Sequence, residues 1–451
     1  MSRAPLALVF ALALAPAAAA ADRAALARAY RRFEAAYAQA APADPAPWNR
    51  RFDLATVSFF AGDPAGAVRA LDEATADLLG AGPSWRRAAA VRLTVSPEVA
   101  VSGEVGGLSI VPSGAAPARL RLRAPDGRVL WTGDLREGVP LDVALRRDLA
   151  PGLYPLEVVA DDGPPLDLRP LVVVARTPEV AAREALARLD ALPPGPAVEA
   201  CRGRAGRLLR ADLARAASEH LVDLPARMAE VDAEVAALAR GEDPYRGRPG
   251  HLWRALRVGD REVPLRTYAP ARGGDAPRPL VVALHGMGGE ENMFLEAYGG
   301  GALVRLADAH GLLVASPSTD ALMATGPAGF DAVVEAVARE HAVDRLRVYV
   351  VGHSMGGGLA ADLARTRADV VAAAACFSGG RFGPGAAPVL VVAAERDLVA
   401  PGALLADRAN RARARGAPIA VLESPGTGHT LTVGARLPEV VGWLLERRGP
   451  V

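Results

Sequence analysis

Residues 347–357, RVYVVGHSMGG, decide the fold of this chain. They join an apolar run of strand-forming residues to a glycine-rich turn around Ser354. A sharp turn of this kind requires neighbours without bulk, which Gly352 and Gly356 provide. Because a helix is predicted to follow over residues 357–365, we expect Ser354 at a strand-to-helix turn, as a candidate nucleophile beside a helix N-terminus.

A serine hydroxyl is a weak nucleophile near neutral pH and needs a base, itself oriented by an acid. Of the seven histidines, only His429 follows the last predicted strand. His353 adjoins the serine on the wrong side of the turn, and His310 and His341 end predicted helices. His429 is therefore the predicted base.

The acid is expected in the loop after the apolar strand 389–393, at the sheet edge where ligands bind. Asp397 and Glu395 both lie in this loop, and Glu423 follows the next strand. We favour Asp397 and leave the two glutamates as alternatives.

Acyl chemistry also needs N–H donors for a developing oxyanion. One is expected from the backbone of Met355, directly after Ser354, and the other from the backbone of Met287, in the loop that follows strand 280–284. His285 begins that loop and is interpreted as a structural residue.

Apolar strand-like runs alternate with helical runs from about residue 246 to residue 451, which predicts an α/β domain with a doubly wound, mostly parallel sheet. In chain order come the His-Gly-x-Gly loop at 285–288, the Ser354 turn, the Asp397 loop and His429. These motifs resemble the α/β-hydrolase superfamily over residues of about 250 to 450.

The resemblance implies hydrolysis of an ester or amide by a Ser354, His429 and Asp397 triad, without a metal or cofactor. It also favours Asp397, because the family's acid precedes a short apolar stretch and a proline, here Pro401. The chain looks most similar to carboxylesterases of the polyhydroxybutyrate depolymerase, feruloyl esterase and dienelactone hydrolase-related group. Dienelactone hydrolases proper use a cysteine nucleophile, so Ser354 departs from them.

Composition changes divide the rest of the chain. The expected regions are a signal peptide (1–21), a helical hairpin region broken at Gly62-Asp63-Pro64 (22–90), an immunoglobulin-like β-sandwich (91–176), a helical segment with a linker (177–245) and the hydrolase domain (246–451). The signal peptide has a short basic start, an apolar core too short to span a bilayer, and small residues before Asp22. We therefore expect an exported, periplasmic or extracellular protein without a later membrane-spanning segment.

The overall charge and the cysteines add little. Fifty-two basic residues face 51 acidic ones, so no nucleic-acid partner is expected. Cys201 and Cys376 are the only cysteines, and we interpret them as buried free thiols. The sequence does not define an oligomeric state.

The expected substrate is a small-molecule or polymer-linked ester. Only a glycine-rich loop separates strand 370–377 from the strand near Pro388, so no lid helices are expected there and we predict an open, shallow cleft. One alternative is a serine peptidase of the prolyl-oligopeptidase-like type. Another is an inactive hydrolase domain that leaves binding to the β-sandwich.

Overall fold

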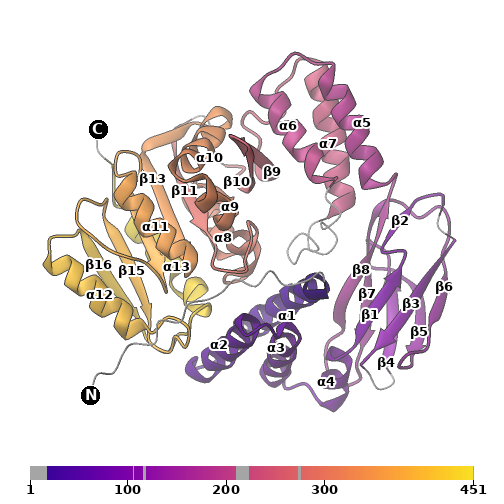
Figure 1. The fold of residues 1–451 in the computed structure, drawn as a ribbon. Coiled ribbons are helices and arrows are strands. Elements are labelled where there is room, and N and C mark those ends of the chain that lie inside the picture. Colours follow the sequence, from indigo (N-terminus) through magenta and orange to yellow (C-terminus); the bar gives the residue numbers. More distant parts are fainter. Residues whose placement is uncertain (1–17, 105, 115–117, 210–222, 273–275, 450–451) are drawn as a thin grey trace.

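An eight-stranded sheet organises the C-terminal part of the computed structural model, which describes residues 18–104, 106–114, 118–209, 223–272 and 276–449. The strand order is β16-β15-β14-β13-β11-β12-β10-β9, parallel from β16 to β12 and antiparallel at β10 and β9 (Figure 1). The strands are β9 (Gly250–Val258), β10 (Arg261–Ala269), β11 (Arg278–Leu284), β12 (Leu313–Pro317), β13 (Val343–His353), β14 (Ala373–Phe377), β15 (Val389–Ala394) and β16 (Ile419–Ser424). The expected α/β class is confirmed.

Helices cover both faces of this sheet, because alternate residues of each central strand point to opposite sides. Val281 of β11 packs into a core with α8 and α13, whereas its neighbour Val282 packs into a second core with α10, α11 and α12. The remaining elements are a π-helical turn, η2, and the short helix α9. The bounds are η2 (Met293–Ala297), α8 (Ala302–His310), α9 (Thr319–Thr325), α10 (Pro327–Glu340), α11 (Met355–Thr366), α12 (Gly402–Ala414) and α13 (Leu431–Leu445).

Two sequence-based boundaries need correction. The apolar pattern predicts a last helix over residues 438–447, but α13 begins at Leu431 and contains Pro438. The helix therefore starts two residues after His429. At the other end of the chain, the expected hairpin is a set of three packed helices followed by a short fourth: α1 (Ala18–Ala40), α2 (Ala46–Phe60), α3 (Pro64–Leu79) and α4 (Pro83–Ala89).

The helix α1 is separate from α2 because the intervening segment, residues 41–45, contains two prolines. The expected signal peptide lies outside the described residues, apart from its last four, which are the first turn of α1. Helices α1 to α3 do not form a core of their own. Phe33, Phe52 and Leu71 belong to the same hydrophobic core as Phe294 and the α13 face of the eight-stranded sheet.

Residues 92–174 form two sheets around one further core. The sheets have the orders β1-β3-β6 and β2-β8-β7-β4-β5, and residues such as Ile110 and Leu156 meet between them. The strands are β1 (Arg92–Ser96), β2 (Val99–Val101), β3 (Gly107–Ser113), β4 (Ala118–Arg123), β5 (Val129–Leu135), β6 (Leu141–Ala144), β7 (Gly152–Val159) and β8 (Leu166–Val174). We call this two-sheet unit the sandwich; its likeness to immunoglobulin modules stays a prediction.

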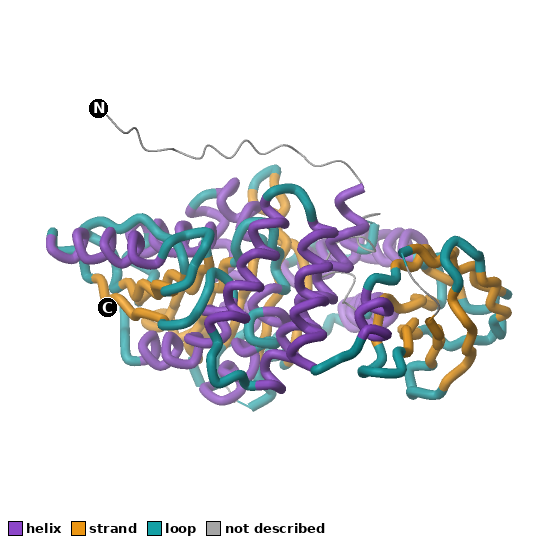
Figure 2. The backbone as a smooth tube through the Cα atoms, turned by 90° about the horizontal axis from the view of Figure 1, so that it is seen from below, coloured by secondary structure: helices purple, strands orange, loops and turns teal. Residues whose placement is uncertain are grey.

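Among the described residues that follow, α5 (Pro178–Asp190), α6 (Pro196–Arg207) and α7 (Leu224–Ala239) connect the sandwich to the eight-stranded sheet. Helix α7 contacts β8, and α6 contacts the edge strand β9. Figures 1 and 2 show α1–α3 between the sandwich and the C-terminal α/β domain, so two separate helical units bridge them. Both cysteines are buried and unpaired.

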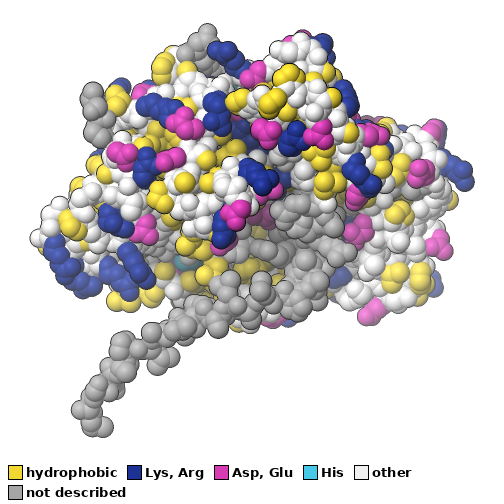
Figure 3. Space-filling view, turned by 45° about the horizontal axis from the view of Figure 1, so that its top comes forward, with side chains coloured by type: hydrophobic (Ala, Val, Ile, Leu, Met, Phe, Trp, Pro, Cys, Tyr) yellow, Lys and Arg dark blue, Asp and Glu magenta, His cyan; other side chains and the backbone are white. Residues whose placement is uncertain are grey.

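The surface drawn in Figure 3 carries basic and acidic side chains interspersed over most of its extent. This mixture agrees with a formal net charge of +1. Within the described residues, no single helix is long and apolar enough to cross a bilayer; only α9 and α10 counted together, across a 117° bend, reach that length and composition.

Candidate active site

Ser354 lies at the turn between β13 and α11 in a strained conformation, with φ 53° and ψ −114°. The two glycines are required by close approach of the backbone. A Cβ on Gly352 would lie 2.0 Å from the carbonyl oxygen of Gly356, and one on Gly356 would lie 2.1 Å from that of Leu284. The local sequence therefore permits a turn that larger residues would block.

Asp397 and His429 are brought together from the loops after β15 and β16, although 32 residues separate them. The His429 Nδ1 atom lies 2.9 Å from Asp397 Oδ2 and 3.0 Å from Oδ1. Asp397 Oδ1 also accepts backbone N–H groups of Val399 at 2.8 Å and Ala400 at 2.6 Å. These bonds hold the carboxylate so that it fixes the tautomer of His429.

The two alternative acids lie elsewhere. The Glu395 carboxylate accepts the N–H of Gly426 at 2.8 Å and is half exposed. Glu423 lies in β16 as an exposed residue, paired in register with Ala393. Asp397 is the carboxylate that meets His429.

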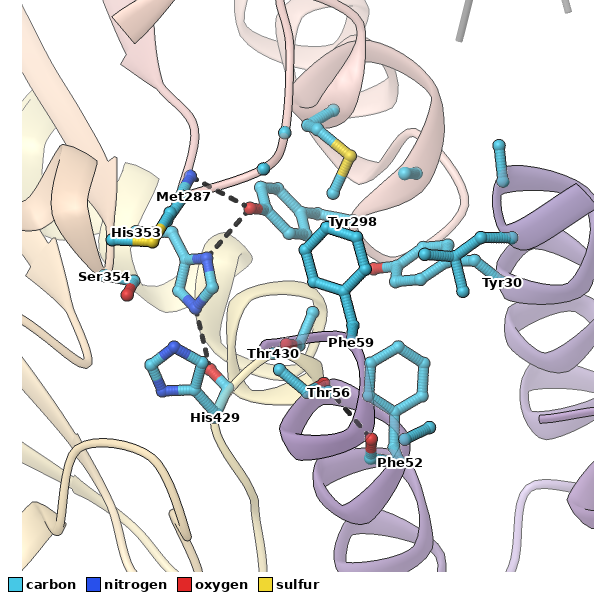
Figure 4. Close-up of a pocket in the computed structure, with 18 of the residues that line it drawn as sticks. Tyr30, Phe52, Thr56, Phe59, Met287, Tyr298, His353, Ser354, His429 and Thr430 are labelled. Atoms are coloured by element: carbon cyan, nitrogen blue, oxygen red, sulfur yellow. Dashed lines mark hydrogen bonds between the residues drawn. The ribbon is translucent and has the colours of Figure 1, made fainter. Parts of the chain in front are cut away.

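The second ring nitrogen of His429, Nε2, is buried and has no hydrogen-bond partner within the described part of the chain. Figure 4 shows Ser354 and His429 on the same side of a pocket, with their side chains close together. An unpaired buried nitrogen costs free energy, so its presence calls for an explanation, and a catalytic role is one. A modest movement of the serine hydroxyl would supply its partner, and such bonds are often long without substrate.

Met355 and Met287, whose role as oxyanion donors stays a prediction, follow the strands β13 and β11. Met355 is the first residue of α11, so its N–H has no partner within that helix. Met287 follows β11, lines the same pocket and is 40% exposed. His285 is fully buried; its Nε2 accepts the N–H of Thr319 at 2.8 Å and its Nδ1 contacts the Gly286 carbonyl at 2.8 Å, so it shapes the loop.

A buried chain of hydrogen bonds behind the site was not predicted. Tyr298 donates its hydroxyl hydrogen to His353 Nδ1 at 2.8 Å, and His353 Nε2 donates to the His429 carbonyl at 3.0 Å (Figure 4). Burial holds the pKa of His353 well below its ordinary value, so its ring stays neutral in this tautomer. His353 thus supports the backbone of His429.

A second support comes from α2. Asp53 accepts the N–H of His429 at 2.9 Å through both carboxylate oxygens and the N–H of Leu398 at 3.1 Å. One helical turn earlier, Asn49 Oδ1 accepts the N–H of Gly428 at 2.7 Å. The only local signal of this role is a pair of polar residues four positions apart on the apolar face of α2.

The pocket in front of Ser354 has a cavity volume of about 150 Å³. One wall is the loop after β11 together with Met293 and Tyr298, and the opposite wall comes from α1, α2 and α3 (Figure 4). The helical lining residues are Leu26, Ala27, Tyr30, Arg31, Phe52, Ala55, Thr56, Phe59, Phe60 and Leu71. As expected, residues 378–388 contain no lid helix, and Ser354 is partly exposed. The cleft is less open than expected, because the N-terminal helices form one of its walls.

Among the described residues, no group of three or more histidine, cysteine or acidic side chains is arranged to hold a metal ion. The polar groups at the pocket instead form the serine, histidine and carboxylate arrangement described above.

Comparison with known proteins places the site in a family context. Residues 302–437 match the model of the dienelactone hydrolase family. This segment contains Ser354, Asp397 and His429. No curated protein matches the chain.

Among solved structures, 44% of the chain aligns with a thermostable esterase at 22% identity and a TM-score of 0.38, over 63% of that protein. The same share aligns with S-formylglutathione hydrolase from Staphylococcus aureus at 17% identity and a TM-score of 0.36, over 99% of that protein. Native esterase 2 from Thermogutta terrifontis aligns at 17% identity and a TM-score of 0.36, over 92% of its length.

The strand order, the strained serine turn and the family match agree with one another. The C-terminal part of the chain is a hydrolase domain of the α/β-hydrolase type, and its residues 302–437 are similar to the dienelactone hydrolase family.

Proposed function

We propose that the protein is an exported serine esterase that works through an acyl-enzyme on Ser354. The observation that carries this proposal is the state of the His429 ring. Its Nδ1 is held by Asp397 at 2.9 Å, while its Nε2 is buried, unpaired within the described residues, and directed to the pocket that Ser354 lines. This is the arrangement in which an imidazole can accept the proton of a serine hydroxyl.

In the proposed reaction, Ser354 Oγ attacks the ester carbonyl carbon while His429 Nε2 takes the hydroxyl proton. The carbonyl oxygen becomes an oxyanion, which the N–H groups of Met355 and Met287 stabilise. When the intermediate collapses, the C–O bond to the alcohol breaks and His429 returns the proton to the leaving oxygen. Water then attacks the acyl-enzyme with the same proton transfers, releasing the acid and restoring Ser354.

The environment of the site favours this chemistry. The positive end of α11 lies at Ser354 and favours the developing negative charge. The walls of the pocket are mostly apolar, so the interactions with the oxyanion are less screened than in water. Losing one N–H donor in such a site costs on the order of 3 kcal/mol in the barrier.

A fluorophosphonate probe tests the nucleophile, because it reacts with activated serines. The wild-type protein should be labelled, and Ser354→Ala should not be labelled while keeping its melting temperature, since only a hydroxyl is removed. Equal labelling of both proteins would contradict the assignment.

A panel of p-nitrophenyl esters and peptide anilides separates an esterase from a serine peptidase. We expect kcat/KM for the esters to exceed kcat/KM for the anilides at least 100-fold. Each factor of ten corresponds to ~1.4 kcal/mol in the activation free energy. Faster turnover of the anilides would favour the peptidase.

Export is proposed from the basic start and short apolar run of residues 1–21. Fractionation of a bacterial host that expresses the full chain tests it. The processed protein should be found outside the cytoplasm, with its new N-terminus near Asp22.

A further inference from the structure

Two features of the N-terminal helices allow the proposed function to be described in more detail. The first is the pair Asp53 and Asn49. These side chains are 0% and 1% exposed, and together they accept the backbone N–H groups of Leu398, Gly428 and His429. Leu398 adjoins Asp397, so the acceptors on α2 bind the loops of both the acid and the base.

A buried carboxylate is expensive when only N–H groups compensate it, and burial raises the pKa of Asp53 to about 6. If this position served only for packing, an apolar residue would give a folded state of equal or lower free energy. Packing of α2 alone does not require Asp53 and Asn49 to accept hydrogen bonds from these loops. Their shared property is that both hold the backbone of the triad in place.

We infer that Asp53 and Asn49 are positioning residues, which hold the Asp397 and His429 loops in register with Ser354. The inference rests on the proposed function. Displacement of about 1 Å at a reacting group can lower a rate about 100-fold, so losing these anchors should lower kcat. Substrate binding to the apolar wall should change little, because neither side chain lines the pocket.

The test uses the full chain with Asp53→Asn and Asn49→Ala, assayed on one p-nitrophenyl ester. Asp53→Asn should lower kcat by about 10- to 100-fold and Asn49→Ala by a smaller factor, each with KM within about twofold. The matched control is Asp72→Asn on α3, which removes a buried carboxylate that pairs with Arg32 at 2.6 Å, away from these loops. It should lower the melting temperature and leave kcat unchanged.

Unchanged kcat in Asp53→Asn, or an equal loss in Asp72→Asn, would overturn the positioning role. Failure of the proposed function gives a different result, because Ser354→Ala would then retain labelling and hydrolysis. A variant that loses kcat but is still labelled, more slowly, supports the inference.

The second feature is the pocket wall made by aromatic residues. The Phe59 ring lies against the loop after β11, since a Cβ on Gly288 would be 2.6 Å from Phe59 Cε1. Phe52, Phe60 and Tyr30 extend this wall from the same helices. The space they leave, about 150 Å³, matches the size of an apolar cavity known to bind benzene in another protein.

We propose that this wall sets the substrate class: an ester that carries one compact apolar group, either a single ring or a short branched chain, on its acyl or its alcohol side. A long linear chain or a polymer segment would require Phe59 to move. This proposal also rests on the proposed function, but it depends on none of the contacts of Asp53.

A set of p-nitrophenyl esters (butyrate, benzoate, decanoate) examines the acyl side, and benzyl and decyl acetates examine the alcohol side. In at least one of the two sets, we expect kcat/KM for a compact ester to exceed that for the ten-carbon ester (decanoate or decyl acetate) by about tenfold or more. Phe59→Ala should reduce that ratio at least fivefold. Leu54→Ala on the same helix, 48% exposed and outside the pocket lining, should leave it unchanged.

Preference of the wild type for the ten-carbon esters in both sets, or the same ratio in Phe59→Ala, would overturn the specificity role. If no ester is hydrolysed by a protein whose Ser354 is also unlabelled, the proposed function itself fails. The two failures are therefore distinguishable.

Discussion

Helices α1–α3 and the sandwich both precede the hydrolase domain, but they relate to its active site differently. The helices share a hydrophobic core with the hydrolase sheet, line the pocket and bind the backbone of His429. The sandwich has its own core, and within the described residues it contributes nothing to the pocket lining. Position along the chain therefore says little about function; what matters is which surface each unit covers.

The largest effect expected in the molecule sets the scale for this comparison. His429→Ala removes the proposed base and leaves both N-terminal units unchanged. We expect kcat to fall by about 10⁴-fold or more, as for a triad member elsewhere. Steady-state kinetics measures this fall, and residual activity within 100-fold of wild type would exclude His429 as the base.

Core truncations compare the two units directly. Phe33→Ala in α1 and Leu156→Ala in β7 both empty fully buried positions and should cost about 3–5 and 2–5 kcal/mol of stability. Phe33 lies 5.2 Å from Phe52 between ring centroids, so its loss should also disturb the pocket wall and raise KM. Denaturant unfolding measures the two losses of stability, and steady-state kinetics on the folded variants measures KM. We expect KM to rise in Phe33→Ala alone; an equal rise in Leu156→Ala would contradict the difference between the two units.

Two glycine substitutions make a smaller, matched test. A Cβ at Gly428 would lie 2.6 Å from Asp53 Oδ1, and one at Gly163 would lie 2.4 Å from Trp85 Cδ1 beside the sandwich. Each change to alanine should cost about 1–3 kcal/mol of stability through overpacking. Only Gly428→Ala should also lower kcat, by about tenfold, because the clash separates α2 from the His429 loop.

The smallest expected effect is the pH dependence of stability due to Asp53. Burial raises its folded pKa from 3.8 to about 6; the hydrogen bonds from the N–H groups of His429 and Leu398 oppose this shift, and the nearby charge of Asp397 adds to it. The folded state then binds the proton more tightly, so this contribution is fully present below pH 3.8 and is lost as the pH rises through about 6.

The melting temperature of wild type minus that of Asp53→Asn should therefore decrease between pH 4 and pH 7. Differential scanning fluorimetry at constant ionic strength measures it. A difference that grows with pH would mean that Asp53 is stabilised as a carboxylate, and a constant one would mean that its pKa is not shifted.

Much of the site can be predicted from local patterns. The strand, the glycines and the helix around Ser354 are contiguous, and a β-α alternation places Asp397 and His429 at the same edge of the sheet. The π-helical turn at Met293–Ala297 and the long start of α13 were not predicted, because each depends on packing against neighbours such as Gly299 and Gly434.

The pocket wall, and the contacts of α2 with the loops of Asp397 and His429, could not be predicted from local patterns. Asp53 meets His429 across 376 residues and Leu398 across 345, and Phe59 meets the loop around Gly288 from a separate helix. Hydrophobic periodicity does not predict contacts over such separations. The polar pair Asn49 and Asp53 on α2 indicates only that these buried side chains need hydrogen-bond partners.

The sequence by itself determined the turn at Ser354 and the chain order of the proposed triad, because both depend on short stretches of chain whose backbone geometry follows from residue size and hydrogen bonding. Only the tertiary structure decided how the site is enclosed. That enclosure arises when the apolar faces of α1–α3 are buried against the hydrolase core, and this burial brings two polar side chains and a row of aromatic rings to loops more than 200 residues away.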